Sequence, residues 1–184
     1  MQKSSNIKRL CVSAIMIALA TVLSLIKVYT LPLGGSITLL SMLPIVFLSV
    51  SYGMGWGFFS AFVYSLIQMF LDLAAVASWG LTPAIFVGCI AFDYILAYTA
   101  LGIAGIFRKK GVWGAALGTG LALFLRFFSH FLSGVILFRS YEMFNSPFLW
   151  SLAYNGSYML PEMIFTAVGV FFLFKNKNLR RILD

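Results

Sequence analysis

The stretch VWGAALGTGLALFLRFFSHFLSGVILF, residues 112–138, decides the fold class of this chain. It is long enough to cross a bilayer, because a spanning helix needs about 20 mostly apolar residues. It also carries a cation and an imidazole four residues apart, at Arg126 and His130. Polar groups at membrane depth are costly and usually face a partner or a cavity. The stretch therefore predicts a membrane helix that carries part of a functional site.

The whole chain has the composition of an integral membrane protein. Of its 184 residues, 61% are hydrophobic and 10% are charged, whereas soluble domains carry about 25% charged residues. The apolar segments predict an all-α protein with six transmembrane helices in a single domain over residues 1–184. The expected helices are about 8–28, 37–52, 55–73, 83–107, 112–138 and 148–175. Residues 31–36 contain a proline and two glycines, and we expect them to form a loop.

The net charge of +8 is concentrated beside the apolar segments. Basic residues favour the cytoplasmic side of membrane proteins. Ten of the thirteen lysines and arginines precede the first segment, separate the fourth from the fifth, or follow the sixth: Lys3, Lys8, Arg9, Arg108, Lys109, Lys110, Lys175, Lys177, Arg180 and Arg181. We therefore expect a multi-pass protein with both termini in the cytoplasm, and no nucleic acid as a partner.

Polar side chains inside the expected spans form the candidate site. They are Asp93, Arg126, His130, Asn155 and Glu162. Arg126 and His130 share one face of the fifth expected helix because they are four residues apart. An acid, an imidazole, an amide and nearby aromatic rings suit a small, flat, polar heterocycle. Arg126 could instead neutralise Asp93 or Glu162 inside the bundle.

Several aromatic side chains flank the spans on the expected outer side: Trp79, Tyr141, Phe144 and Trp150. They could belong to the aromatic belt at the membrane interface, or they could roof a ligand cavity.

Signatures of an energy source or a catalytic centre are missing from the sequence. It contains no P-loop and no His-Glu-x-x-His or comparable metal set. One pocket in six short helices therefore predicts a substrate-capture subunit. Two alternatives stay open. One is a membrane enzyme that uses Glu162 and His130 as acid and base. The other is a stand-alone carrier with Asp93 or Glu162 as its proton site.

Four blocks resemble the thiamine-specific substrate-binding components of energy-coupling factor transporters, the ThiT/YuaJ family. The first is the pair of small residues Ala14 and Ala18, which would let another helix approach closely. The others are residues 31–38 with 42–45, residues 93–107, and residues 126–134 with 151–159. The resemblance covers nearly the whole chain. It implies six transmembrane helices with an outward-facing pocket beneath the loop between the first two.

The resemblance also implies a role for each matching residue. The expected pocket residues are Asp93, Tyr94, His130, Phe138, Trp150 and Asn155. Arg126 and Glu162 are expected supports, with Arg126 holding the acid in place. Ala14 and Ala18 are expected to contact the transmembrane coupling protein.

Three of these positions depart from the family pattern. Asp93 stands where members often have Glu, Phe138 where some have Trp, and Trp150 where members often have Tyr. The shorter acid and the weaker cation–π surface at Phe138 keep other ligands open. Hydroxymethylpyrimidine, a thiamine precursor, and riboflavin are the alternatives to thiamine.

The implied function is that of the capture subunit of an ATP-driven vitamin importer in the bacterial cell membrane. It would take thiamine from outside and deliver it through a coupling protein driven by two ATPase subunits. No catalytic residue, cofactor or metal is expected in this chain itself.

Overall fold

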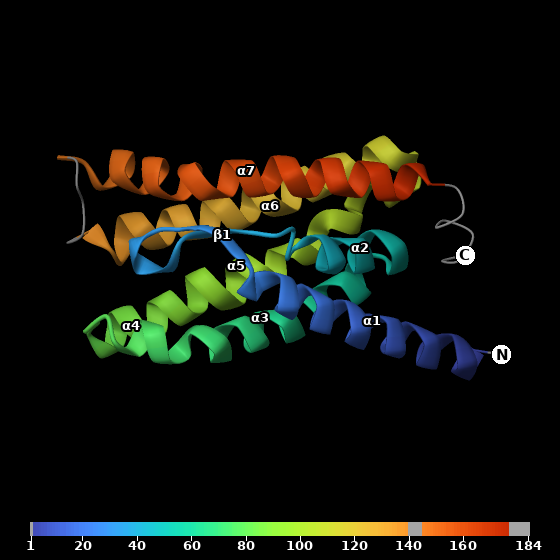
Figure 1. The fold of residues 1–184 in the computed structure, drawn as a ribbon, viewed down its shortest axis with the longest axis horizontal. Coiled ribbons are helices and arrows are strands. Elements are labelled where there is room, and N and C mark those ends of the chain that lie inside the picture. The colour runs from blue at the N-terminus through green and yellow to red at the C-terminus, as the bar shows by residue number, and fades with distance from the viewer. Residues whose placement is uncertain (1, 140–144, 177–184) are drawn as a thin grey trace.

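The structure is a computed structural model, and it describes residues 2–139 and 145–176. Tyr141 and Phe144 lie outside the described residues. Helices dominate the described part (Figure 1). The elements in chain order are α1 (Gln2–Leu25), β1 (Lys27–Thr30), η1 (Pro32–Gly34), β2 (Ser36–Thr38), α2 (Leu43–Tyr52), α3 (Met54–Ala77), α4 (Pro83–Cys89), η2 (Ile90–Leu96), α5 (Ala97–Thr99), η3 (Ala100–Lys110), α6 (Gly111–Ile136) and α7 (Pro147–Lys175).

The described helices account for six passes along the bundle, as the sequence predicts. Four helical runs are long and apolar enough to span a membrane. One of them, Pro83–Ile136, turns back at Gly111, whose φ of 70° and ψ of −151° are not helical. This run therefore supplies two passes. The remaining pass, α2, has 10 residues, or about 15 Å of helix, and is too short to cross alone. The chain is an all-α, multi-pass membrane protein.

The connection between α1 and α2 is a β-hairpin. Its turn coincides with the expected loop at residues 31–36, but the expected helix limits at residues 28 and 37 are wrong, because both residues belong to its strands. The strands β1 and β2 pair antiparallel, with Lys27 opposite Thr38 and Thr30 opposite Ser36. At the turn, Leu31 N donates to Gly35 O at 2.6 Å. The first helix consequently ends at Leu25 instead of residue 28. The second helix begins at Leu43 instead of residue 37. Pro44 lies in the first turn of this helix, which is a favoured position for proline.

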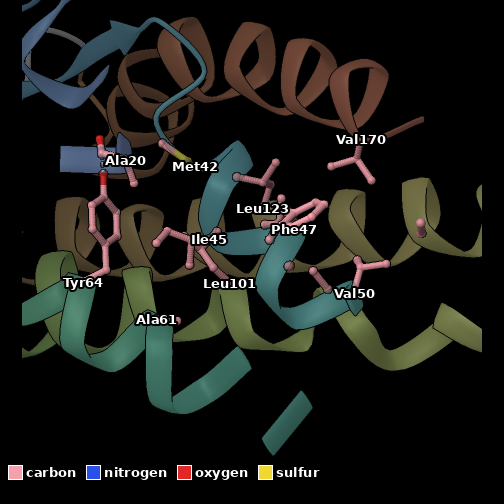
Figure 2. Packing of buried hydrophobic residues seen from close by; sticks show 14 of the residues in the cluster. Ala20, Met42, Ile45, Phe47, Val50, Ala61, Tyr64, Leu101, Leu123 and Val170 are labelled. Carbon is pink, nitrogen blue, oxygen red and sulfur yellow. Dashed lines mark hydrogen bonds between the residues drawn. The ribbon is translucent and has the colours of Figure 1, made fainter. Parts of the chain in front are cut away.

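The helices pack around the short α2 (Figure 1). α6 runs beside α7 and also packs against η3, and α3 lies along the run from α4 to η3. Figure 2 shows Ile45 and Phe47 of α2 in the centre of the core, with Tyr64 of α3 pointing toward Ala20 of α1. Tyr64 Oη donates to Ala20 O at 3.4 Å. Residues 44–50 of α2 are all buried, which explains why the helix is mostly apolar.

Close contact between α2 and η3 depends on glycine. Gly105 N donates to Ser49 Oγ at 2.9 Å, and an added Cβ on Gly105 would lie 2.3 Å from Ser49 O. We expect Gly105→Ala to lower the free energy of unfolding by about 1–3 kcal/mol, the usual cost of overpacking. Thermal unfolding of the detergent-purified protein measures this. Gly120→Ala is the matched control, because no atom lies within 4 Å of its added Cβ. Equal melting temperatures for the two variants would contradict this packing.

Candidate functional site

A cavity of about 190 Å³ lies within the bundle, at the end that carries the hairpin. This end is opposite the start of α1 and the end of α7 (Figure 1). The structure brings seven of the sequence-predicted residues to its walls: Asp93, Tyr94, Arg126, His130, Phe138, Trp150 and Asn155. The hairpin contributes Lys27, Leu33, Gly34, Gly35, Ser36 and Thr38. Residues distant in the sequence therefore share one chamber with a roof formed by the hairpin.

An acid and an imidazole meet across two helices in this chamber. Asp93, on the π-helical turn η2, accepts from Ser133 Oγ at 2.6 Å, and its other oxygen lies 2.8 Å from His130 Nδ1. Single π-helical turns are frequent at functional sites. Buried Nε2 of His130 has no hydrogen-bond partner among the described residues. One nitrogen of the ring is thus fixed by Asp93, and the other is available to a ligand.

The amide of Asn155 is engaged by its protein surroundings. Nδ2 donates to His130 O at 3.2 Å and to Ser151 O at 3.0 Å, while Oδ1 accepts from Tyr158 Oη at 2.9 Å. These bonds join α6 to α7 next to Gly134, where an added Cβ would lie 2.2 Å from Ser151 Oγ. Asn155 therefore stabilises the wall that holds His130, in addition to lining the cavity.

Aromatic rings from α7 form a second wall. Trp150 and Tyr154 are stacked with their centroids 5.1 Å apart and an interplanar angle of 14°, and Tyr158 lies edge-on to Tyr154. Phe138 faces Trp79 edge-on at 6.2 Å. Sequence reasoning missed Tyr154 and Tyr158 as site residues. Their four-residue spacing from Trp150 on one helix face is the signal that could have found them.

Two side chains of α7 fix the hairpin over the cavity. Tyr154 Oη accepts from Gly35 N at 3.0 Å and donates to Pro32 O. Glu162 is 2% exposed and lies outside the cavity lining. Its Oε1 accepts from Thr38 N and, at 2.6 Å, from Thr38 Oγ1. The hairpin is thus hydrogen-bonded to α7 at its turn, through Tyr154, and at the end of β2, through Glu162.

Comparisons with known proteins show the family to which the chain belongs. A family model described as "Thiamine transporter protein (Thia_YuaJ)" matches residues 10–181. The chain belongs to this family of thiamine transporter proteins. It is 29% identical to the thiamine transporter ThiT of Bacillus subtilis, with 95% of this chain and 94% of that protein covered. A solved structure of ThiT from Listeria monocytogenes matches the fold with a TM-score of 0.76 and 22% identity, over 96% of this chain and 98% of that one.

In this family member, Arg126 pairs with neither acid considered from the sequence. Among the described residues, no ion pair joins it to Asp93 or Glu162. Its guanidinium instead lies 4.4 Å from the centroid of the Tyr98 ring and contacts Met42 Sδ. Arg126 is 5% exposed and its Nε has no hydrogen-bond partner in the described part of the chain. A cation–π contact therefore holds this buried cation beside the cavity.

Ala14 and Ala18 lie on the exposed outer face of α1, outside the residues that line the cavity. Ile15, which follows Ala14 in the sequence and points about 100° further around the helix, is 66% exposed. The described residues contain no group of three or more His, Cys, Asp or Glu side chains that could hold a metal ion. The cavity is therefore the feature of the described structure with the clearest binding chemistry.

Proposed function

We propose that this thiamine transporter is the capture subunit of an ATP-driven importer of the energy-coupling factor type. The observation that supports it most is the roofed cavity, in which the pair of Asp93 and His130 faces an aromatic wall. Such a chamber can enclose a small molecule at one end of the bundle. Capture by this chain and energy from partner subunits would then be separate tasks.

Thiamine suits the chemistry of the two walls. Its exocyclic amino group can donate to an oxygen of Asp93 or to Nε2 of His130, which is an acceptor when Nδ1 donates to Asp93. Its thiazolium ring is a cation, and cations are attracted to the faces of aromatic rings such as those of Trp150 and Tyr154. Phe138 would close the stack, and Tyr94, which also lines the cavity, would contact the ligand. Hydroxymethylpyrimidine could bond the polar wall but lacks a cationic ring to stack on the aromatic wall. Riboflavin would need more space along the aromatic wall.

The charge distribution supports a cavity that opens to the outside of a bacterial cell. The described basic clusters, Lys8 with Arg9, Arg108 to Lys110, and Lys175, lie away from the hairpin at the end where α1 begins and α7 ends. Basic clusters favour the cytoplasm, so the termini would be cytoplasmic and the hairpin would face outward.

The exposed face of α1 around Ala14 and Ala18 is the proposed contact for the transmembrane coupling protein. Small side chains allow close approach of a second helix. Two ATPase subunits would supply the energy, because the chain has no P-loop of its own. On this proposal the chain is a binding protein and not an enzyme.

Uptake by proteoliposomes tests the coupling. We expect radiolabelled thiamine to accumulate only when the chain is reconstituted with a coupling protein and two ATPase subunits, with ATP on the side of the chain termini. Vesicles holding the chain alone under an imposed proton gradient are the control. Accumulation in those vesicles would favour the stand-alone carrier and contradict the proposal.

A further inference from the structure

Asp72 brings a second carboxylate to the cavity. It lies near the end of α3, is partly buried and lines the same chamber as Asp93. Gln68, one turn earlier on the same helix face, also lines the chamber and donates from Nε2 to Ser24 Oγ at 2.9 Å. Elsewhere on α3, apolar side chains such as Phe62 and Phe70 are exposed on the outer surface. The helix therefore turns a polar face toward the ligand space.

The carboxylates of Asp93 and Asp72 differ in the hydrogen bonds that they form with other protein side chains. Asp93 holds His130 at 2.8 Å and Ser133 at 2.6 Å. Asp72 accepts one longer bond, from Tyr94 Oη at 3.2 Å. A carboxylate offers about four acceptor positions. Most of the hydrogen-bonding capacity of Asp72, which lines the cavity, is therefore not used by the described residues.

The cations that line the cavity do not neutralise Asp72 by contact. Arg126 lies on the ring of Tyr98, and Lys27 belongs to the hairpin. Within residues 2–139 and 145–176, no lysine or arginine forms an ion pair with Asp72. A partly buried carboxylate attracts a cation more strongly than one in bulk water, because the effective dielectric constant around it is lower. A ligand cation in the chamber would be attracted in this way.

We infer that Asp72 sets the preference of this site for a cationic ligand over a neutral one of the same shape. The inference deepens the proposed function and rests on it, because it assumes that thiamine occupies the cavity. Asp93 and His130 would recognise the pyrimidine edge whatever the charge of the other ring. Asp72, held by Tyr94, would act on the thiazolium charge. Removal of the Asp72 charge should then weaken the binding of thiamine without weakening the binding of a neutral isostere.

Binding of two ligands by three proteins tests this inference. The ligands are thiamine and its analogue with a neutral thiophene ring in place of the thiazolium. The proteins are the wild type, Asp72→Asn and Glu162→Gln, all titrated in detergent. We expect Asp72→Asn to weaken the affinity for thiamine at least about tenfold and to change the affinity for the analogue less than about twofold. Glu162→Gln is the matched control, because it removes a charge outside the cavity lining and should weaken both ligands by the same factor.

Each outcome separates the inference from the function on which it rests. Wild-type protein that binds no thiamine contradicts the proposed function itself. Wild-type protein that binds both ligands equally well overturns the inference alone, and it does so without any variant. Equal loss of both ligands in Asp72→Asn would also overturn it, since that pattern indicates a structural role.

Discussion

Replacement of His130 by alanine is expected to weaken thiamine binding at least about a hundredfold. The variant loses the nitrogen available to the ligand and leaves Asp93 without the partner that lies 2.8 Å away. Loss of the bond from the ligand to Nε2 and of the support that His130 gives Asp93, at about 1.5 kcal/mol each, amounts to about 3 kcal/mol, and each 1.4 kcal/mol is about tenfold in affinity. Calorimetric titration of the purified variant measures the loss.

Phe128→Ala is the control for this variant, because Phe128 lies on the same helix, is 46% exposed and does not line the cavity. It should bind thiamine as the wild type does. Wild-type affinity for thiamine in His130→Ala would show that His130 does not contribute to the binding site. Melting temperatures of both variants show whether a loss of binding comes from loss of the fold.

Large side chains on the exposed face of α1 are expected to abolish uptake and to spare binding. In the double variant Ala14→Trp/Ala18→Trp, two indole rings would hold a partner helix away from a surface that small residues keep open. Both positions lie outside the cavity lining, so the affinity for thiamine should stay at the wild-type value. ATP-driven uptake in vesicles that hold all partner subunits should fall to background.

The double variant Ile15→Trp/Leu19→Trp is its matched control. These residues have the same spacing on α1, next to Ala14 and Ala18, and are 66% and 44% exposed. Uptake should persist there, because the rings would face a different direction. Normal uptake in the Ala14→Trp/Ala18→Trp variant would refute the docking role of this face.

The sequence predicts the helices and the wall residues of the site because both rest on simple physical demands. Apolar length identifies a membrane helix, and the segments 112–138 and 148–175 differ from α6 and α7 by at most two residues at either end. The cost of burying polar groups singles out Asp93, His130 and Asn155. Four-residue spacing then places such groups on common faces.

The rest depends on contacts that local patterns do not encode. The hairpin of β1 and β2 is stabilised by Tyr154 and Glu162, more than 100 residues away in the sequence, so its residues look like a plain loop. Arg126 contacts the ring of Tyr98 instead of an acid, and charge counting alone cannot choose between these partners. Asp72 lies close to the end of α3, where an acid is common on a membrane surface and gives no sign of facing a cavity.

Titration of the purified chain with thiamine, in detergent and without nucleotide or a second protein, tests the central claim most directly. We predict tight binding of one thiamine per chain, and weaker binding of hydroxymethylpyrimidine and riboflavin under the same conditions. Binding of thiamine that requires ATP or partner subunits, or a preference for either of the other two ligands, would contradict the account.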